Sequence, residues 1–150
     1  MTLVVHVASE GVRIPVAARR LAGLARRVLR SEGIANAMLS IAFISNSAMA
    51  ALNRRHLGRK GSTDVIAFGL SSTGDSGPVV GDIYIAPAVA RANAQRLGLS
   101  IREEMARLVV HGTLHVLGYV HPVSDARLDS AMWRKQELLL RRGIPRARGK

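Results

Sequence analysis

Three histidines lie close together in an otherwise apolar stretch, HGTLHVLGYVH, at residues 111–121. His111 and His115 are four residues apart, so a helix would place both imidazoles on one face, one turn apart. Gly118 is a natural helix stop, and a glycine there lets the chain reverse and bring His121 back to the same point. Imidazoles at this spacing are typical of a zinc site.

Three protein ligands leave the fourth position of a tetrahedral zinc ion open to water. Bound zinc lowers the pKa of that water to about 7 and so supplies hydroxide at neutral pH. The pattern therefore predicts a hydrolase with one zinc ion per chain, bound by His111, His115 and His121. Three imidazoles also accept nickel, copper or cobalt, so the pattern does not choose among these metals.

The same spacing occurs in the metzincin protease pattern, H-E-x-x-H-x-x-G-x-x-H, and Gly118 falls on its glycine. In those proteases the glutamate after the first histidine is the general base. This chain has Gly112 at that position, which argues against peptide hydrolysis by the usual mechanism. A zinc hydrolase acting on a peptide or a nucleotide is kept as a further alternative.

The remaining histidines are interpreted as structural. His6 falls inside an apolar predicted strand, where a histidine is usually a satisfied core residue. His56 falls in a basic segment and is expected to be an exposed loop residue.

The formal net charge of the chain is +12, and its cations are clustered. Segments rich in arginine and free of acids lie at residues 11–31 and 53–61 and in the C-terminal LLLRRGIPRARGK. Clustered arginine on a small domain predicts a polyanionic partner, most often nucleic acid. Because the chain has one Trp, two Tyr and two Phe, we expect a nucleic acid to be held by charge and shape more than by stacking.

The length of 150 residues suits one domain, residues 1–150, in which 145–150 form a loose basic tail. The absence of cysteine excludes disulfides and thiolate metal sites. No apolar run is long enough to span a membrane, and the N-terminus lacks the features of a signal peptide. We therefore expect a cytoplasmic protein with no membrane partner and no small-molecule cofactor.

Periodicity and capping signals predict an α+β fold, with a small mixed four-stranded sheet packed with about five helices. The zinc site lies at the end of a core helix in this arrangement, and the third and fourth strands pair antiparallel. The predicted strands are residues 2–9, 37–45, 62–70 and 81–87, and the segment 70–80 is a predicted loop. The predicted helices are residues 15–33, 46–55, 87–98, 100–118 and 124–143.

Two of these helices carry distinctive signals. The helix opened by Pro15 places Leu21, Leu24 and Val28 on one side and its five arginines on the other, which predicts a core-packed helix with a basic outer face. In the histidine helix, Ser100 and Glu103 fit the S-x-x-E capping box, so we assign both to capping alone.

The histidine stretch and several other segments resemble the YbeY endoribonucleases, a family of bacterial rRNA maturation factors. The family signature H-G-x-L-H-L-x-G-Y-D-H is matched at His111, Gly112, Leu114, His115, Gly118, Tyr119 and His121. LN at 52–53, TDVIAF at 63–68 and GDIYIA at 81–86 follow in the family order, as does the final helix with Met132 and Glu137. The resemblance covers roughly residues 40–140.

The resemblance implies a metal-dependent, single-strand-specific endoribonuclease that acts in rRNA processing, in 16S rRNA 3′-end maturation and in ribosome quality control. It implies that His111, His115 and His121 bind the zinc ion, with His111 at the catalytic centre. The implied partners are single-stranded RNA or rRNA and the ribosome or components of its small subunit.

The chain departs from the family pattern at two positions that bear on catalysis. Val120 stands where an aspartate usually precedes the third histidine, so any role of that carboxylate in orienting a ligand is lost or moved. Leu57 stands where the family often has an arginine proposed to assist catalysis; Arg59 is our candidate replacement, and Arg55 is the alternative. The second departure motivates another hypothesis, a ribosome-binding assembly factor with structural zinc and weak or no catalysis.

Two acids are candidates for orienting an imidazole. Glu104 lies seven residues before His111 on the same helical face, and Asp64 lies in the TDV segment. Each has an equally good structural interpretation, Glu104 as a solvated first-turn acid and Asp64 as a strand-edge or turn residue. The sequence does not identify the general base.

Overall fold

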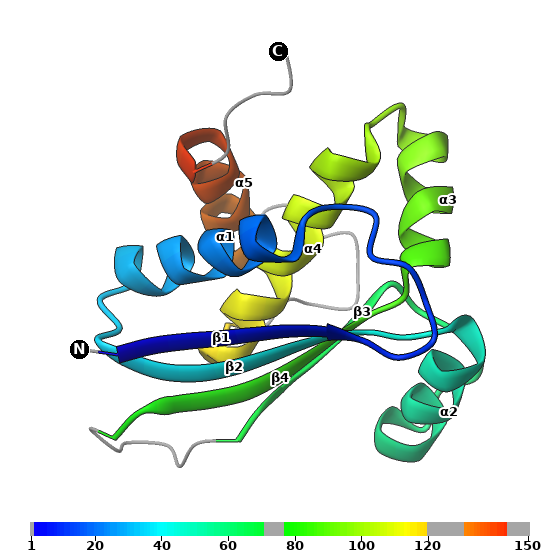
Figure 1. Cartoon of the computed structure of the whole chain (residues 1–150), viewed down its shortest axis with the longest axis horizontal. Helices are drawn as coiled ribbons and strands as arrows, with labels where there is room; N and C mark the ends of the chain where they lie inside the picture. The colour runs from blue at the N-terminus through cyan, green and yellow to red at the C-terminus, as the bar shows by residue number, and fades with distance from the viewer. Residues whose placement is uncertain (1, 71–76, 120–130, 144–150) are drawn as a thin grey trace.

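The computed structural model describes residues 2–70, 77–119 and 131–143. They form a four-stranded sheet in the order β1-β2-β4-β3 and five helices (Figure 1). The strands are β1 (Thr2–Ser9), β2 (Asn36–Phe43), β3 (Val65–Gly69) and β4 (Val79–Ile85). The helices are α1 (Ala18–Ser31), α2 (Asn46–Leu57), α3 (Pro87–Leu97), α4 (Ile101–Val116) and α5 (Ala131–Gly143). The predicted α+β fold is confirmed.

The sheet is mixed, as predicted. β1 pairs parallel with β2, and β2 pairs parallel with β4. β3 pairs antiparallel with β4, with Val65 opposite Ile85 and Gly69 opposite Gly81. Parallel neighbours need a crossover connection, and α1 supplies it between β1 and β2.

The two faces of the sheet are covered differently. Figure 1 shows α1, α4 and α5 together on one side of the sheet, with α2 on the other side at one end. The main core lies under the three helices and includes Ile41, Ile83 and Val109. A smaller cluster under α2 includes Met49 and Ile66. Because side chains alternate along a strand, each strand contributes to both faces.

The predicted start of the first helix is wrong by one turn. α1 begins at Ala18 rather than Pro15, because Ile14 and Val16 pack against the core from an irregular segment ahead of the helix. The amphipathic prediction is confirmed, since Leu21, Leu24 and Val28 are buried and most of the helix arginines are exposed. The predicted helix 124–143 is described from Ala131 onward, and its first part lies outside the described residues.

The interpretation of His6 as a core residue is also wrong. His6 is exposed on β1, next to the buried Val5, because strand alternation turns it to the face opposite the main core. His56 is exposed as expected, but it lies on the last turn of α2 rather than in a loop. Its ring meets the edge of Phe68, with a centroid separation of 5.2 Å.

The histidine-bearing helix α4 approaches the sheet unusually closely. A Cβ atom built on Gly112 would lie 2.8 Å from Cγ2 of Ile83 on β4. One built on Gly81 of β4 would lie 2.4 Å from the Val116 side chain and 2.9 Å from the Phe68 carbonyl oxygen. Glycine at these positions lets the end of α4 lie directly on β3 and β4.

Replacing Gly112 with alanine should therefore push α4 away from β4. We expect the Gly112→Ala variant to lose about 1–3 kcal/mol of unfolding free energy in urea, the usual cost of overpacking a core. The matched control is Gly23→Ala in α1, where an added Cβ meets nothing within 4 Å. That variant should gain roughly 0.5–1 kcal/mol from the better helix propensity of alanine. Equal effects at both positions would contradict the close approach.

Candidate metal centre

The helix that carries the histidines is defined at both ends. The Ser100 side chain accepts from the Glu103 amide at 3.1 Å, and Glu103 Oε1 accepts from the Ser100 amide at 3.0 Å. This is the predicted capping box. Gly118 follows the helix with a φ of 101°, a conformation that favours glycine, so the predicted helix stop is confirmed.

His111 and His115 lie on one face of α4, as their spacing predicts. Their ring centroids are 5.0 Å apart, with an angle of 67° between the ring planes. Both side chains are half-buried at the C-terminal end of the helix. Gly112, which directly follows His111, seats the helix against the Ile83 side chain of β4.

A neighbour on α5 holds the His111 imidazole. Nδ1 of His111 is 2.8 Å from Oε1 of Gln136, whose side chain is only 2% exposed. An amide oxygen can only accept, so Nδ1 carries the proton and Nε2 of the neutral ring carries the lone pair. A lone pair on Nε2 is what a metal ligand needs.

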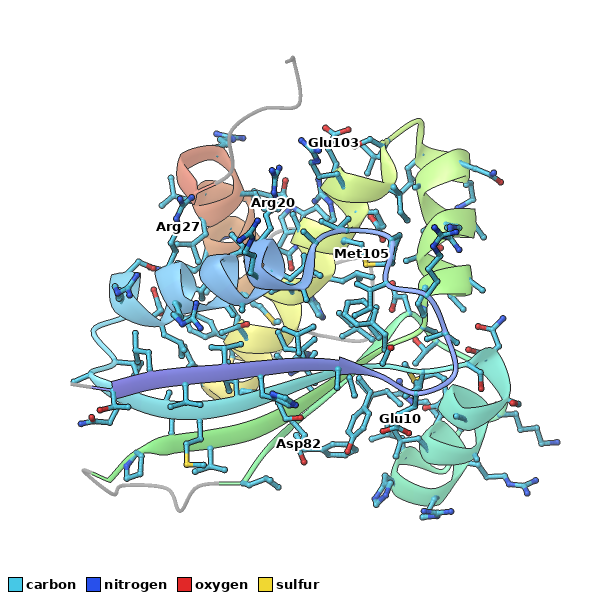
Figure 2. All side chains as sticks on the ribbon, viewed as in Figure 1. Glu10, Arg20, Arg27, Asp82, Glu103 and Met105 are labelled. Carbon is cyan, nitrogen blue, oxygen red and sulfur yellow. The ribbon has the colours of Figure 1, made fainter. Side chains whose placement is uncertain are left out.

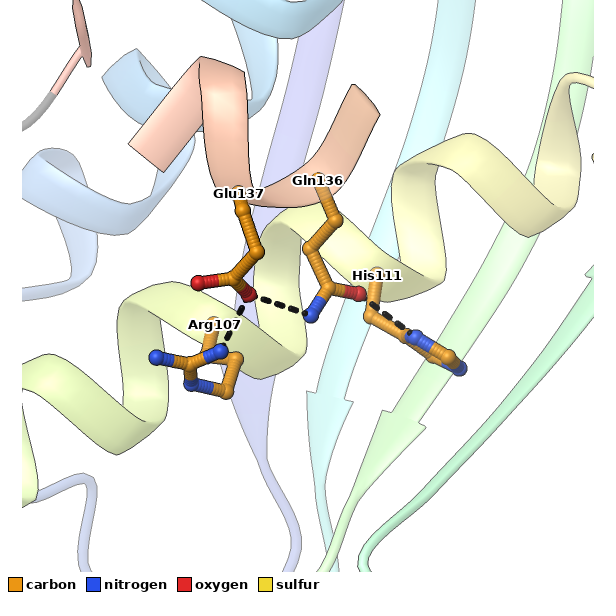
Figure 3. A network of polar contacts seen from close by, with 4 residues as sticks. All are labelled: Arg107, His111, Gln136 and Glu137. Carbon is orange, nitrogen blue, oxygen red and sulfur yellow. Dashed lines mark hydrogen bonds and ion pairs between the residues drawn. The ribbon is translucent and has the colours of Figure 1, made fainter. Parts of the chain in front are cut away.

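Gln136 is itself held by a charged pair. Its Nε2 donates to Oε2 of Glu137 at 3.3 Å, and Arg107 donates to the same carboxylate oxygen and forms an ion pair with it (Figure 3). The Arg107 guanidinium also lies 5.9 Å from the Trp133 ring centroid. The four polar residues therefore form one chain of contacts between α4 and α5.

The third predicted ligand, His121, lies outside the described residues, which end at Tyr119 before the gap. Among the residues that the structure describes, no three His, Cys, Asp or Glu side chains gather in a metal-binding group. Tyr119 is firmly placed, because its hydroxyl donates to Oε1 of Glu32 at 2.6 Å, and Lys135 contacts the other oxygen at 3.2 Å. The hydrogen bond to Glu32 raises the pKa of Tyr119 above its ordinary value.

The two candidate acids, Asp64 and Glu104, accept hydrogen bonds from the same side-chain amide. Asn93 on α3 donates to Oδ2 of Asp64 at 3.1 Å and to Oε2 of Glu104 at 3.5 Å. Asp64 also accepts from the Val65 amide at 2.8 Å, which fits the turn-residue interpretation. Glu104 is 3% exposed, so its interpretation as a solvated acid is wrong. Its Oε1 is buried without a hydrogen-bond partner, and burial raises its pKa.

The loop 58–61 that follows α2 is anchored to the helix by a side-chain hydrogen bond, and its residues are exposed. Asn53, buried in α2, donates to the Gly61 carbonyl at 3.0 Å and so fixes the loop between them. Gly58 ends the helix in a left-handed conformation with a φ of 65°. Arg55 and Arg59, the two candidate catalytic arginines, are both exposed, Arg55 on the last turn of α2 and Arg59 in the loop that follows it.

His111 and His115, the two predicted ligands that the structure describes, are suited to bind a metal ion. Two imidazoles share one face at helical spacing, and the contact of Nδ1 of His111 with Gln136 places the lone pair of that ring on Nε2. Neutral nitrogen ligands suit zinc and its neighbours in the first transition series.

Comparison with known proteins places the chain in a family. The family model described as endoribonuclease YbeY matches residues 7–143. The endoribonuclease YbeY of Anaeromyxobacter sp. (strain Fw109-5) is 38% identical over 140 residues, covering 93% of this chain and 71% of that protein. The endoribonuclease YbeY of Bacillus licheniformis is 34% identical over 161 residues, covering 98% of this chain and 99% of the relative. The chain belongs to the endoribonuclease YbeY family.

A solved structure supports the fold. The solution structure of TM1509 from Thermotoga maritima superimposes with a TM-score of 0.58 at 23% identity. The match covers 91% of this chain and 86% of that one. Family membership confirms the sequence prediction of an enzyme of the endoribonuclease class, and the YbeY family implies a metal-dependent one. No helix among the described residues is long and apolar enough to cross a bilayer.

Sequence reasoning missed Gln136, the residue that contacts His111. A signal for it exists in the sequence, because Met132, Gln136, Leu139 and Leu140 follow helical spacing and all lie on the packed side of α5. A glutamine on the apolar face of a helix needs a buried partner. The sequence shows that need but does not show that the partner is His111.

Glu104 and Glu103, two adjacent acids at the start of α4, should make the stability of the fold depend on pH in opposite directions. Burial, reinforced by Asp64, raises the pKa of Glu104 above 4.5, although Asn93, Arg107 and Arg96 oppose the shift. The folded state therefore binds this proton more tightly than the unfolded state, and stability falls as pH rises from 4.5 through the raised pKa. Glu104→Gln should remove that fall in urea unfolding measured from pH 4 to pH 8.

Glu103 is the matched control for this prediction. Its hydrogen bonds with Ser100 lower its pKa below 4.5. Its contribution is therefore present above pH 4.5 and is lost as pH falls through the lowered value. Glu103→Gln should accordingly weaken the protein at neutral pH. If both variants changed stability by a constant amount at every pH, the assigned pKa shifts would be wrong.

Proposed function

We propose that this protein is a zinc-dependent endoribonuclease that cleaves single-stranded RNA. The observation that carries the proposal is the imidazole pair of α4, in which His111 and His115 face one another and Gln136 fixes the proton of His111 on Nδ1. Membership of the YbeY family supports RNA as the substrate. The net charge of +12 supports a polyanionic ligand.

His111, His115 and His121 would hold one zinc ion in each chain. When bound, zinc can polarise a phosphoryl oxygen and present hydroxide at neutral pH. Three protein ligands leave a position for water or substrate, which distinguishes a catalytic site from a closed structural one. His111 is thus both a ligand and part of the catalytic centre.

Arginines on two surfaces are suited to bind the RNA backbone. Figure 2 shows Arg20 and Arg27 projecting from α1 on the side away from the sheet. Arg55 is exposed on the last turn of α2, and Arg59 is exposed in the loop that follows it. Phosphate contacts of this kind hold RNA without reading its sequence. We assign to Arg59, with Arg55 as the alternative, the role of neutralising charge that develops on the phosphate.

The packing at Gly112 supports a nuclease rather than a metzincin-like protease. The general base of those proteases occupies this position, and even a Cβ atom there would lie 2.8 Å from the Ile83 side chain. A glutamate at position 112 would therefore collide with the Ile83 side chain.

The family resemblance supports a more specific role. We infer that the substrate is rRNA, that the enzyme acts in 16S rRNA 3′-end maturation and ribosome quality control, and that it works in the cytoplasm on the ribosome or its small-subunit components. The competing function is a ribosome-binding assembly factor with structural zinc and weak or no catalysis. Leu57, exposed at the end of α2 where the family often has an arginine, favours this alternative.

The first test joins zinc content to cleavage. Purified wild type, His111→Ala and His115→Ala would be assayed for bound zinc and for cutting of single-stranded and duplex RNA. We expect one zinc per wild-type chain, cutting of single strands only, and loss of both properties in the two variants. His6→Ala is the matched control, because His6 is exposed on the sheet. Stoichiometric zinc with no cutting by the wild type would favour the assembly-factor alternative.

Arginine variants separate catalysis from backbone binding. We expect Arg59→Ala to lower kcat at saturating RNA by roughly 100- to 1000-fold, the usual cost of removing one group that stabilises transition-state charge. Arg30→Ala on the exposed face of α1 should instead weaken binding and reduce the salt slope by about one. If Arg55→Ala rather than Arg59→Ala lowers kcat, the role belongs to Arg55. Unchanged kcat in both would remove arginine from the mechanism.

A further inference from the structure

We propose that Gln136 is a positioning residue that fixes the His111 tautomer and thereby makes Nε2 the metal-binding nitrogen. This inference rests on the proposed function, because it assigns His111 a metal. Gln136 touches neither substrate nor metal in this account. It acts on the centre through the 2.8 Å contact between its Oε1 and Nδ1 of His111.

The orientation of the Gln136 amide follows from its other contact. The amide could in principle present either its oxygen or its NH₂ group to His111. Oε2 of the Glu137 carboxylate, 3.3 Å from Nε2 of Gln136, can only accept a hydrogen bond. Rotating the amide would place its oxygen against that carboxylate and would lose the donor contact. The carboxylate therefore turns Oε1 of Gln136 toward His111.

The carboxylate is itself fixed by a cation. Arg107, on the same helix as His111 and one turn before it, pairs with Oε2 of Glu137. Figure 3 shows the resulting path from Arg107 through Glu137 and Gln136 to the imidazole. Because Gln136 is 2% exposed, water competes little for its two contacts, and hydrogen bonds in such surroundings are stronger than in water.

The chemistry of the acceptor matters as well as its position. A carboxylate in this place would pull more strongly on the Nδ1 proton and raise the basicity of the bound nitrogen. A neutral amide selects the same tautomer with less electron donation to the metal. The ion pair of Arg107 and Glu137 orients the Gln136 amide. That amide lies between the Glu137 carboxylate and the His111 imidazole, so the carboxylate charge does not contact the ring.

The test uses Gln136→Met, which keeps side-chain length and suits a buried position but removes the acceptor. In the metal-free full-length chain, ¹⁵N NMR of labelled histidine should show Nδ1–H for His111 in the wild type and appearance of the Nε2–H form in the variant. Competition with a chelator should show zinc affinity falling roughly 10- to 100-fold. Gln95→Met on the exposed side of α3 is the matched control and should change neither.

A second variant covers the case in which Gln136→Met does not fold. Glu137→Met leaves Gln136 in place but removes the group that orients its amide, so both tautomers of His111 should appear and zinc affinity should fall by a smaller factor. Side-chain exposure of 26% at Glu137 makes this exchange tolerable. Unchanged tautomer and zinc affinity in the variant that folds would overturn the proposal.

The outcomes also separate this inference from the proposed function. If His111→Ala binds zinc as tightly as the wild type, His111 is not a ligand and the proposed function itself fails. If His111→Ala loses zinc while Gln136→Met keeps both wild-type affinity and the Nδ1–H form, the positioning role alone is wrong.

Discussion

The fold depends on how closely α4 can lie on the sheet at Gly112. With no side chain at this position, the helix backbone meets the Ile83 side chain directly, and Gly81 receives Val116 one turn further on. A helix held at two points along one side cannot rotate about its axis. The directions of its other side chains, those of His111 and His115 among them, are therefore fixed.

The side of α4 away from the sheet is completed by α5, and polar contacts there are arranged in a fixed order. A cation on α4 orients a carboxylate on α5, the carboxylate orients an amide, and the amide orients an imidazole back on α4. Each group contacts the next one as a donor facing an acceptor. Glu104 lies outside this chain, and one of its oxygens is buried without a hydrogen-bond partner, as is Nε of Arg107.

The ends of the histidine-bearing helix and the pairing of its two imidazoles were predictable from short sequence patterns. The capping box at Ser100 and Glu103, the stop at Gly118 and the spacing of His111 and His115 all depend on neighbours within a few residues, and the structure has each of them. The antiparallel pairing of β3 with β4 also followed from pattern and spacing. The family resemblance rested on short motifs, and comparison with known proteins confirms it.

What the sequence could not supply depends on contacts between distant segments. Gln136 contacts His111 across 25 residues, and nothing local indicates that partner. His6 was misplaced because an apolar strand does not reveal which of its faces the helices cover. The start of α1 was misplaced because the sequence does not show that Ile14 and Val16 pack on the core from a non-helical segment.

X-ray absorption at the zinc K-edge of the metal-loaded protein would test the central claim most directly. The account predicts three imidazole nitrogens at about 2.0–2.1 Å and one oxygen from water, the coordination of an open catalytic site. A spectrum fitted by fewer than three imidazoles, or by four protein ligands with no water, would contradict it.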